Sequence, residues 1–140
     1  DHARSPFWAM DELLSKFSGE EYKDLNIFVD FHAETTAEKL CLGGYLKNRV
    51  AAVVGTHTHV ATADSRLMGD TAYVTDVGMV GPLDASLWIK FENAIHNFKY
   101  PYKMPPTIEE EGKMVFNAVL IEVEKGKAKN INRVDKYINP

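Results

Sequence analysis

The sequence predicts an α/β fold, and three observations support this class. Two runs rich in Val, Ile, Phe and Ala, at 27–31 and 50–54, have the composition of buried strands. A helical pattern between them gives the strand–helix–strand order of a parallel sheet with a right-handed crossover. The chain has 140 residues, of which 45% are hydrophobic and 26% charged, as expected for one globular domain.

A helix is expected near the start of the chain. Ser5 can cap this helix, and Pro6 can occupy its first position, where no backbone N–H is needed. The helix carries an apolar stripe formed by Phe7, Met10, Leu13, Leu14 and Phe17. Because such a stripe must be buried, the helix needs a partner surface. Residues 19–26 then form a polar connection to the first strand.

The helix between the two strands opens with the sequence Thr35-Thr36-Ala37-Glu38. This spacing matches a capping box, in which Thr35 accepts a hydrogen bond from the backbone of Glu38. Its apolar positions are Leu40, Cys41, Leu42, Tyr45 and Leu46. The helix is expected to end near Lys47 and Asn48, just before the second strand.

The second half of the chain predicts shorter elements. Residues 65–75 form a hairpin with Gly69-Asp70 at its turn. Residues 76–82 form a glycine-punctuated loop, which either approaches a ligand closely or is a plain turn. An amphipathic helix is expected over 86–98.

The end of the chain predicts an irregular segment and a hairpin. Three prolines between 100 and 106 exclude regular structure there. Residues 115–124 and 128–134 then form a closing hairpin around Lys125-Gly126-Lys127.

Three histidines follow the two predicted parallel strands. His32 comes after the first strand, and His57 and His59 come after the second. Because side chains of an extended chain alternate, the His-x-His spacing is expected to place two imidazoles on one face. The carboxyl ends of parallel strands form sites at one edge of a sheet, so the three histidines predict a transition-metal site there.

The other two histidines lack such a context, and we expect both His2 and His96 to be exposed to solvent.

Charge and composition restrict the possible classes of function and the cellular location. The net charge of −4 argues against a protein that binds nucleic-acid backbones in general. Cys41 is the single cysteine, so no internal disulfide is possible, which fits a reducing compartment. Since neither a membrane span nor a signal peptide is recognisable, a cytoplasmic location is expected.

Three segments of the chain carry a family resemblance. They are Asp30-Phe31-His32-Ala33-Glu34-Thr35-Thr36-Ala37-Glu38-Lys39, then Ala52-Val53-Val54-Gly55-Thr56-His57-Thr58-His59-Val60, and finally Thr75-Asp76-Val77-Gly78-Met79. In this order they resemble the YmdB-like metallophosphoesterases of the calcineurin-like phosphoesterase superfamily. The resemblance extends from Pro6 to the final hairpin. It implies a sheet with flanking helices and a metal site at the carboxyl ends of the strands.

The resemblance also implies an activity. It points to a bacterial phosphodiesterase that acts on 2′,3′-cyclic nucleotides through two transition-metal ions, which would be iron, manganese or zinc. By position, His32 and His57 would bind one ion and His59 the other. Two such ions clamp the phosphate and lower the pKa of a water, whose hydroxide attacks phosphorus in line with the leaving ribose oxygen.

Four further residues are candidates for contacts to the phosphate or to the metal ligands: Glu34, Thr35, Thr36 and Gly78. The first three lie at the start of a predicted helix, where backbone N–H groups favour anions. The alternative is that they only cap the helix.

One part of the family pattern is missing from the chain. The amino-terminal half of the family supplies an Asp, a bridging Glu, an Asn, and an Asn-His pair whose histidine is the catalytic acid. No segment of residues 1–140 matches these residues. We therefore expect the chain to be the carboxyl-terminal part of a single metallophosphoesterase domain. It would be inactive alone, would need the amino-terminal half as its partner, and would form a homo-oligomer.

Two other functions remain open at this point. The chain can be a non-enzymatic metal-binding or assembly module that uses an uncovered helix face or sheet edge. It can also be a single-zinc hydrolase in which His32, His57 and His59 leave a fourth position open.

Overall fold

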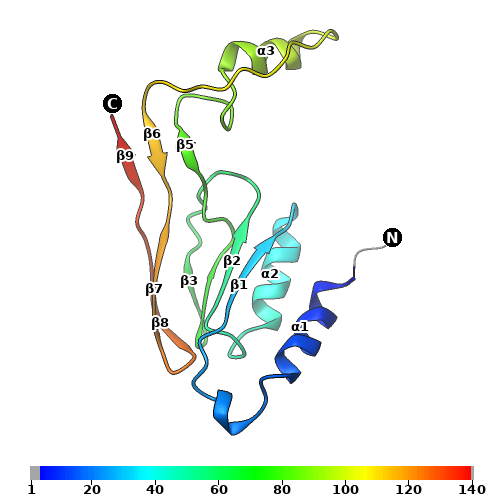
Figure 1. Ribbon diagram of the computed structural model, residues 1–140, viewed down its shortest axis with the longest axis vertical. Coiled ribbons are helices and arrows are strands. Elements are labelled where there is room, and N and C mark those ends of the chain that lie inside the picture. Colours follow the sequence, from blue (N-terminus) through cyan, green and yellow to red (C-terminus); the bar gives the residue numbers. More distant parts are fainter. Residues whose placement is uncertain (1–3, 140) are drawn as a thin grey trace.

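The computed structural model describes residues 4–139 and shows a mixed α/β molecule (Figure 1). His2 lies outside the described residues. The helices are α1 (Pro6–Ser15), the short 3₁₀ turn η1 (Glu20–Tyr22), α2 (Thr36–Tyr45) and α3 (Phe91–Lys99). The strands are β1 (Phe28–His32), β2 (Ala52–Thr56), β3 (Arg66–Met68), β4 (Thr71–Val74), β5 (Val80–Pro82), β6 (Met114–Phe116), β7 (Val119–Glu124), β8 (Lys127–Arg133) and β9 (Lys136–Ile138).

The central sheet has the strand order β1-β2-β4-β3. β1, β2 and β4 are parallel, and β3 is antiparallel to β4. The helix α2 connects β1 to β2, so the predicted strand–helix–strand unit and the α/β class are confirmed. The parallel arrangement brings the carboxyl ends of β1 and β2 to one edge, where His32 pairs with Thr56.

Two layers cover the central sheet. On one face α1 and α2 enclose a core of Leu42, Leu46, Val50, Val53 and Tyr73. On the other face the β7–β8 hairpin encloses a second core of Ala52, Ala72, Val74, Ala128 and Ile131. The finer prediction, a calcineurin-like sandwich, stays a prediction.

The first helix begins as the sequence predicts. Pro6 occupies the first turn of α1, although the side chain of Ser5 makes no capping hydrogen bond. Phe7, Met10 and Leu14 pack against the helix-side core. The remainder of the predicted stripe, Leu13 and Phe17, is 43% and 38% exposed.

The capping box of α2 is confirmed in its first half. The Glu38 N–H donates to Thr35 Oγ1 at 3.2 Å. The Glu38 carboxylate, however, accepts from the Thr35 hydroxyl at 2.7 Å instead of returning to the backbone. Thr35 is therefore fully engaged in starting the helix.

Three predicted boundaries are wrong. The second strand runs from Ala52 to Thr56, two residues later than predicted. The helix predicted over 86–98 begins only at Phe91, because Leu87 has a left-handed backbone (φ 66°) within a turn closed between Ser86 and Ile89. Part of the glycine-punctuated loop is the strand β5, which pairs with β6.

The predicted closing hairpin is longer than the sequence indicates. β7 pairs with β8, and β6 pairs with β9, so the chain forms an extended ribbon whose upper part also includes β5. Beyond this ribbon α3 projects away from the sheet (Figure 1).

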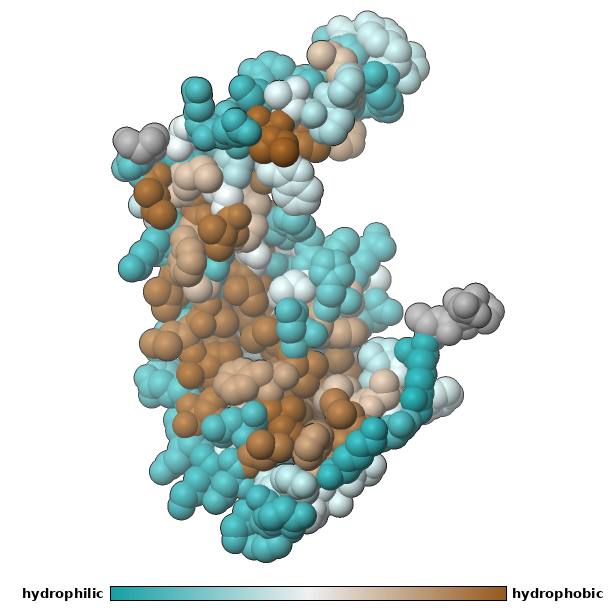
Figure 2. All heavy atoms as spheres, viewed as in Figure 1, coloured by the Kyte–Doolittle hydropathy of each residue, from teal (hydrophilic) through white to brown (hydrophobic). Residues whose placement is uncertain are grey.

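Figure 2 shows a broad apolar area over the middle of the molecule, between the ribbon and the helices. Phe28 on β1 is 54% exposed.

The predicted exposure of His96 is wrong. His96 lies on α3 with its ring 4.8 Å from that of Tyr100 and 5.0 Å from that of Tyr102. Its Nδ1 atom is buried. Within residues 4–139, none of the helices combines the length and apolar composition that crossing a membrane requires.

Two adjacent glycines of α2 provide a matched test of this packing. A Cβ atom at Gly43 would lie 2.5 Å from the ring of Tyr73, whereas at Gly44 it would meet nothing within 4 Å. We expect Gly43→Ala to lower the free energy of unfolding by about 1–3 kcal/mol through overpacking. Gly44→Ala should raise it by roughly 0.5–1 kcal/mol, because alanine favours helices. Urea denaturation measures both, and equal effects of the two substitutions would contradict this packing.

Candidate metal centre

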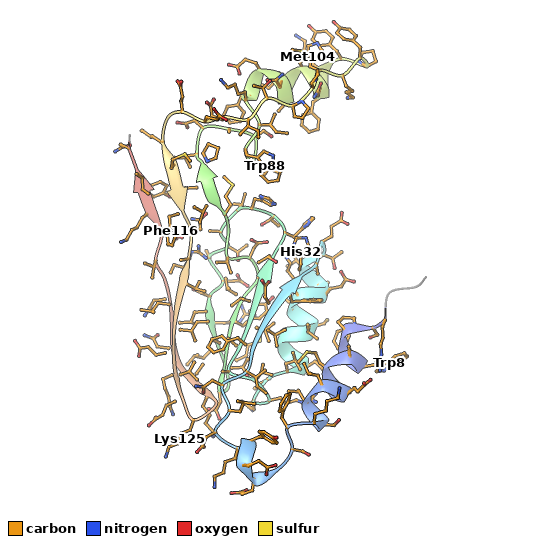
Figure 3. The ribbon with its side chains drawn as sticks, in the orientation of Figure 1. Trp8, His32, Trp88, Met104, Phe116 and Lys125 are labelled. Carbon is orange, nitrogen blue, oxygen red and sulfur yellow. The ribbon has the colours of Figure 1, made fainter. Side chains whose placement is uncertain are left out.

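His32 and His57 meet at the carboxyl ends of β1 and β2. His32 Nε2 lies 3.3 Å from His57 Nδ1, and the two rings are nearly perpendicular, with 83° between their planes. Both side chains are exposed, and Figure 3 shows His32 at the end of its strand. Two nitrogens that each bind one tetrahedral metal ion at roughly 2.0–2.1 Å lie about 3.3 Å apart. The pair therefore fits as two ligands of one transition-metal ion.

A hydrogen-bonded chain sets the tautomer of His32. The Thr56 hydroxyl donates to Asp30 Oδ1 at 3.2 Å, so its single hydrogen is used there. His32 Nδ1 lies 3.2 Å from the same hydroxyl oxygen and must donate to it. This arrangement places the His32 proton on Nδ1 and leaves Nε2 unprotonated, facing His57 Nδ1. Partners of this kind orient the histidine ligands of metal sites.

The backbone after β2 is not extended. His57 has φ 147° and His59 has φ 61°, so both lie in a bend and not on a strand. The expectation that strand alternation places these two imidazoles on one face is therefore wrong. β2 ends at Thr56, and the segment after it is hydrogen-bonded through Thr58 to Asp76 in the loop that follows β4.

The turn of the His57–His59 segment is fixed by Asp76. Asp76 Oδ2 accepts a hydrogen bond from the Thr58 N–H at 2.8 Å, between the two histidines. Its other oxygen accepts from the Gly78 N–H at 3.0 Å. The carboxylate thus connects the loop after β2 to the loop after β4.

The charge of Asp76 is balanced by Lys39 of α2. Lys39 Nζ lies 3.0 Å from Asp76 Oδ2, and the two side chains are 1% and 0% exposed. Burial alone would raise the pKa of Asp76, but the hydrogen bonds from Thr58, Gly78 and Lys39 outweigh it and hold the pKa below its ordinary value. The carboxylate is therefore ionised where it holds the loop.

Close packing surrounds this ion pair. A Cβ atom at Gly55 would lie 1.8 Å from the carbonyl oxygen of Thr75 and 3.0 Å from the Lys39 side chain. Gly55 therefore allows the ends of β2 and β4 to approach each other above Lys39. The Val77 N–H donates to the Gly55 carbonyl at 2.9 Å and closes this contact.

A second ion pair braces the same loop from the ribbon. Arg133 on β8 donates to the Val77 carbonyl at 2.8 Å and to Asp135 Oδ1 at 2.7 Å. The hydrogen bond from Arg133, together with that from Asn117, lowers the pKa of Asp135 to about 2. Both layers of the fold thus contribute to the position of the loop after β4.

The sequence reasoning missed these positioning residues. Asp30, Lys39, Thr56 and Asp76 all lie inside the segments that carried the family resemblance. Their roles can be recognised only in the folded structure, because Lys39 and Asp76 are 37 residues apart in the chain. The signal that the sequence did offer is that Lys39 and Asp76 are charged residues at positions where a buried residue is expected.

The four candidates for phosphate contacts have different surroundings. Glu34 and Thr36 are exposed near the start of α2, and the hydroxyl of Thr35 is used in the cap. Gly78 has φ 96°, and a Cβ atom there would collide with Asn117. Its N–H is occupied by Asp76. The glycine therefore serves the loop structure, and a phosphate contact stays a prediction for all four.

His59 lies apart from a complete ligand set. Its ring centroid is 4.8 Å from that of Trp88, in the segment before α3. Among residues 4–139 no group of three or more His, Cys, Asp or Glu side chains is arranged to hold a metal ion. The described residues therefore bring together two histidine nitrogens, His32 Nε2 and His57 Nδ1, at a spacing that one ion could bridge. The assignment of His59 to a second ion stays a prediction.

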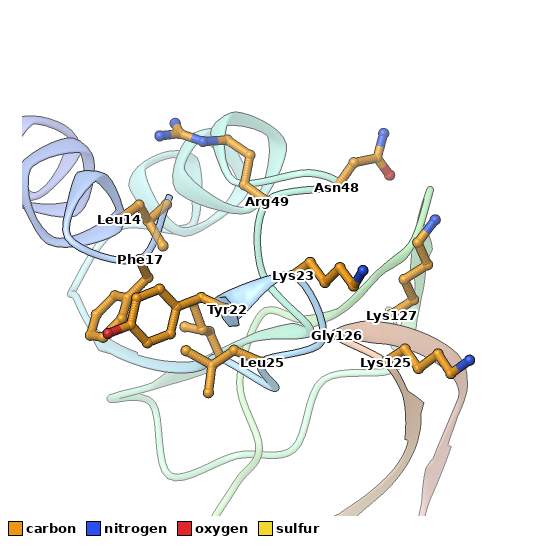
Figure 4. A pocket seen from close by; sticks show the side chains of 11 residues that line it. Leu14, Phe17, Tyr22, Lys23, Leu25, Asn48, Arg49, Lys125, Gly126 and Lys127 are labelled. Atoms are coloured by element: carbon orange, nitrogen blue, oxygen red, sulfur yellow. The ribbon is translucent and has the colours of Figure 1, made fainter. Parts of the chain in front are cut away.

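A separate pocket of about 300 Å³ lies near the turn between β7 and β8 (Figure 4). Its lining includes Lys23, Arg49 and Lys127. Each of these cations already pairs with an acidic side chain, namely Glu20, Asp11 and Asp70. Three of the four cations in the lining are thus paired, Lys125 being the fourth, and the pocket is distinct from the histidine pair.

Comparisons with known proteins identify the family of the chain. The family model described as YmdB-like protein matches residues 1–134. The chain belongs to this family. It is 45% identical over 132 residues to the 2′,3′-cyclic-nucleotide 2′-phosphodiesterase of Bacillus subtilis, an alignment that covers 92% of the chain and 48% of that relative. The chain thus spans about half the length of that curated relative.

Two solved structures share the fold. A hypothetical protein from Thermus thermophilus is 37% identical with a TM-score of 0.86, and the match covers 100% of this chain and 53% of that one. A novel phosphatase from Mycoplasma pneumoniae is 33% identical with a TM-score of 0.84, covering 96% and 47%. The mixed α/β arrangement is therefore shared with a known phosphatase structure.

Removal of the buried counter-ion tests how the loop is held. We expect Asp76→Asn to lower the free energy of unfolding by about 3–5 kcal/mol, because it leaves the Lys39 ammonium buried without a counter-charge. The matched control is Asp70→Asn, which removes the partner of Lys127 from a pair whose side chains are 58% and 48% exposed. That change should cost less than about 1 kcal/mol. Chemical denaturation compares them, and equal losses would refute the role of Asp76.

Proposed function

We propose that this chain is part of a metal-dependent phosphodiesterase that hydrolyses 2′,3′-cyclic nucleotides at a dinuclear metal site. The observation that carries the proposal is the 3.3 Å approach of His32 Nε2 to His57 Nδ1, with a hydrogen-bond chain that frees the His32 lone pair. Membership of the YmdB-like family and the name of the Bacillus subtilis relative support the substrate class.

The residues of this chain act by binding and positioning. His32 and His57 would hold one ion, and His59 would hold its neighbour. The ions, once bound, supply positive charge at the phosphate and lower the pKa of water. Asp76 and Lys39 keep the His57–His59 loop in place, so His57 is held beside His32 before substrate binds. We propose iron, manganese or zinc, since imidazole nitrogen suits each of these metals.

The start of α2 would receive the phosphate. Thr35 caps the helix, and Thr36 is its first residue. The N–H groups of the first helical turn favour an anion. Since β1 ends at His32, only a short connection separates the proposed metal ligand from this helix start. Glu34 lies in this connection and would contact the metal ligands or the phosphate, whereas Gly78, whose N–H is held by Asp76, would act through the loop after β4.

The remaining catalytic groups would come from another part of the protein. Two converging ligands do not fill the coordination shell of a transition metal, which has four or more positions. We propose that the chain is the carboxyl-terminal part of one metallophosphoesterase domain in a calcineurin-like sandwich. The amino-terminal part would then supply the further ligands and the general-acid histidine, and would cover apolar surface such as Phe28. Without it the chain would be inactive.

A second candidate function is a non-enzymatic metal-binding or assembly module, which would include a homo-oligomer. The observation in its favour is that the described residues bring together two ligands and no group of three. The same observation disfavours a single-zinc hydrolase built from His32, His57 and His59. A module predicts metal binding and self-association without hydrolysis of any phosphodiester.

Histidine substitutions in the full-length gene product test the proposal. We expect His57→Ala and His32→Ala to reduce the metal content and to lower kcat for 2′,3′-cyclic AMP by at least about 100-fold, because a ligand is lost. His96→Ala is the control, since His96 packs against Tyr100 and Tyr102 on α3. It should keep the metal and the activity. Measurements are elemental analysis and product release.

Two results would contradict the proposal. Full activity of the His57→Ala variant would show that His57 is not a ligand. A wild-type protein that binds metal but hydrolyses no cyclic nucleotide would favour the module.

A further inference from the structure

An exposed tryptophan stands beside the proposed metal ligand His59. The centroid of the Trp88 ring lies 4.8 Å from that of His59, with 44° between the ring planes. Trp88 is 44% exposed, so it is not buried by this contact. Figure 3 shows Trp88 on the side of the α3 segment that faces the end of β1, where His32 lies.

The backbone of Trp88 is held on both sides. Its N–H donates to the Ser86 carbonyl at 3.0 Å, and its carbonyl accepts from the Glu109 N–H at 2.8 Å. Ser86 and Ile89 close the turn around it as a β-bridge. The backbone that carries the indole is therefore held in place by hydrogen bonds on both sides.

The turn closed by Ser86 and Ile89 carries backbone strain. Leu87 has φ 66°, a conformation that branched residues rarely adopt, and its side chain is 40% exposed. Strained backbone of this kind concentrates at ligand sites. Here the strain occurs in the residue that precedes Trp88. The turn thus presents an indole toward the histidines at some conformational cost.

We propose that Trp88 is the stacking surface for the nucleobase of the substrate. This inference rests on the proposed function, which places the phosphate of a cyclic nucleotide at the histidines. When the phosphate binds beside His59, one ribose separates it from the base. The indole of Trp88, which packs on His59, can contact a base at that distance. Stacking on an aromatic ring tolerates every base, because each base has a π-face. Trp88 itself is 44% exposed, so part of its ring is accessible to such a base.

Kinetics with and without a base test the inference on the full-length gene product. We expect Trp88→Ala to raise KM for 2′,3′-cyclic AMP roughly 5- to 150-fold, the usual contribution of one stacked base, with little change in kcat. Trp88→Phe should recover most of this loss because it keeps an aromatic face. With methyl riboside 2′,3′-cyclic phosphate, which has no base, Trp88→Ala should match the wild type.

A control and a binding arm complete the test. Trp8→Ala is the control, since Trp8 lies on α1 and is 70% exposed, and it should leave KM unchanged. Calorimetry with adenosine 3′-monophosphate and ribose 5-phosphate measures recognition without hydrolysis. The wild type should bind the adenosine compound more tightly, and Trp88→Ala should remove that difference.

The outcomes separate the two proposals. Tighter binding of the adenosine compound that depends on Trp88, in a protein without hydrolysis, would support the stacking site and refute the proposed function. An unchanged KM in Trp88→Ala, an equal loss on the base-free substrate, or equal binding of both probes by the wild type would each overturn the role of Trp88.

Discussion

The buried ion pair between Lys39 and Asp76 is the interaction on which the rest of the site depends. Its two side chains are almost completely buried, yet it joins three elements: α2, the loop after β2 and the loop after β4. A buried charge is costly unless it is paired and hydrogen-bonded, and Asp76 meets both conditions. The pair holds Thr58 between the two histidines, so the conformation of the His57–His59 loop is fixed by contacts with the core.

Much of the fold could be predicted from the sequence because the relevant signals are local. The Val-rich strands, the proline start of α1 and the capping box of α2 each depend on neighbouring residues, and each is confirmed apart from shifts at the boundaries. The turn around Leu87 could not be predicted, since the helical pattern of 86–98 continues through it. Its cause is a left-handed residue held by the bridge between Ser86 and Ile89.

The site could be predicted only in part. The sequence indicated that His32 and His57 follow parallel strands, and the structure brings their nitrogens together. It did not indicate how they are held, because Asp76 reaches Thr58 through tertiary contact. The reasoning from strand alternation failed for His59, whose left-handed backbone turns it toward Trp88. Side-chain direction after a strand depends on the loop, and this loop is set by residues distant in the chain.

The central claim is that His32 and His57 share one metal ion. Anomalous diffraction from crystals of the full-length gene product, grown with manganese and collected with the anomalous signal of that metal, tests it most directly. The account predicts a peak within about 2.0–2.3 Å of both His32 Nε2 and His57 Nδ1. Peaks that contact neither nitrogen, or an N–H···N hydrogen bond between the two rings in protein saturated with metal, would contradict it.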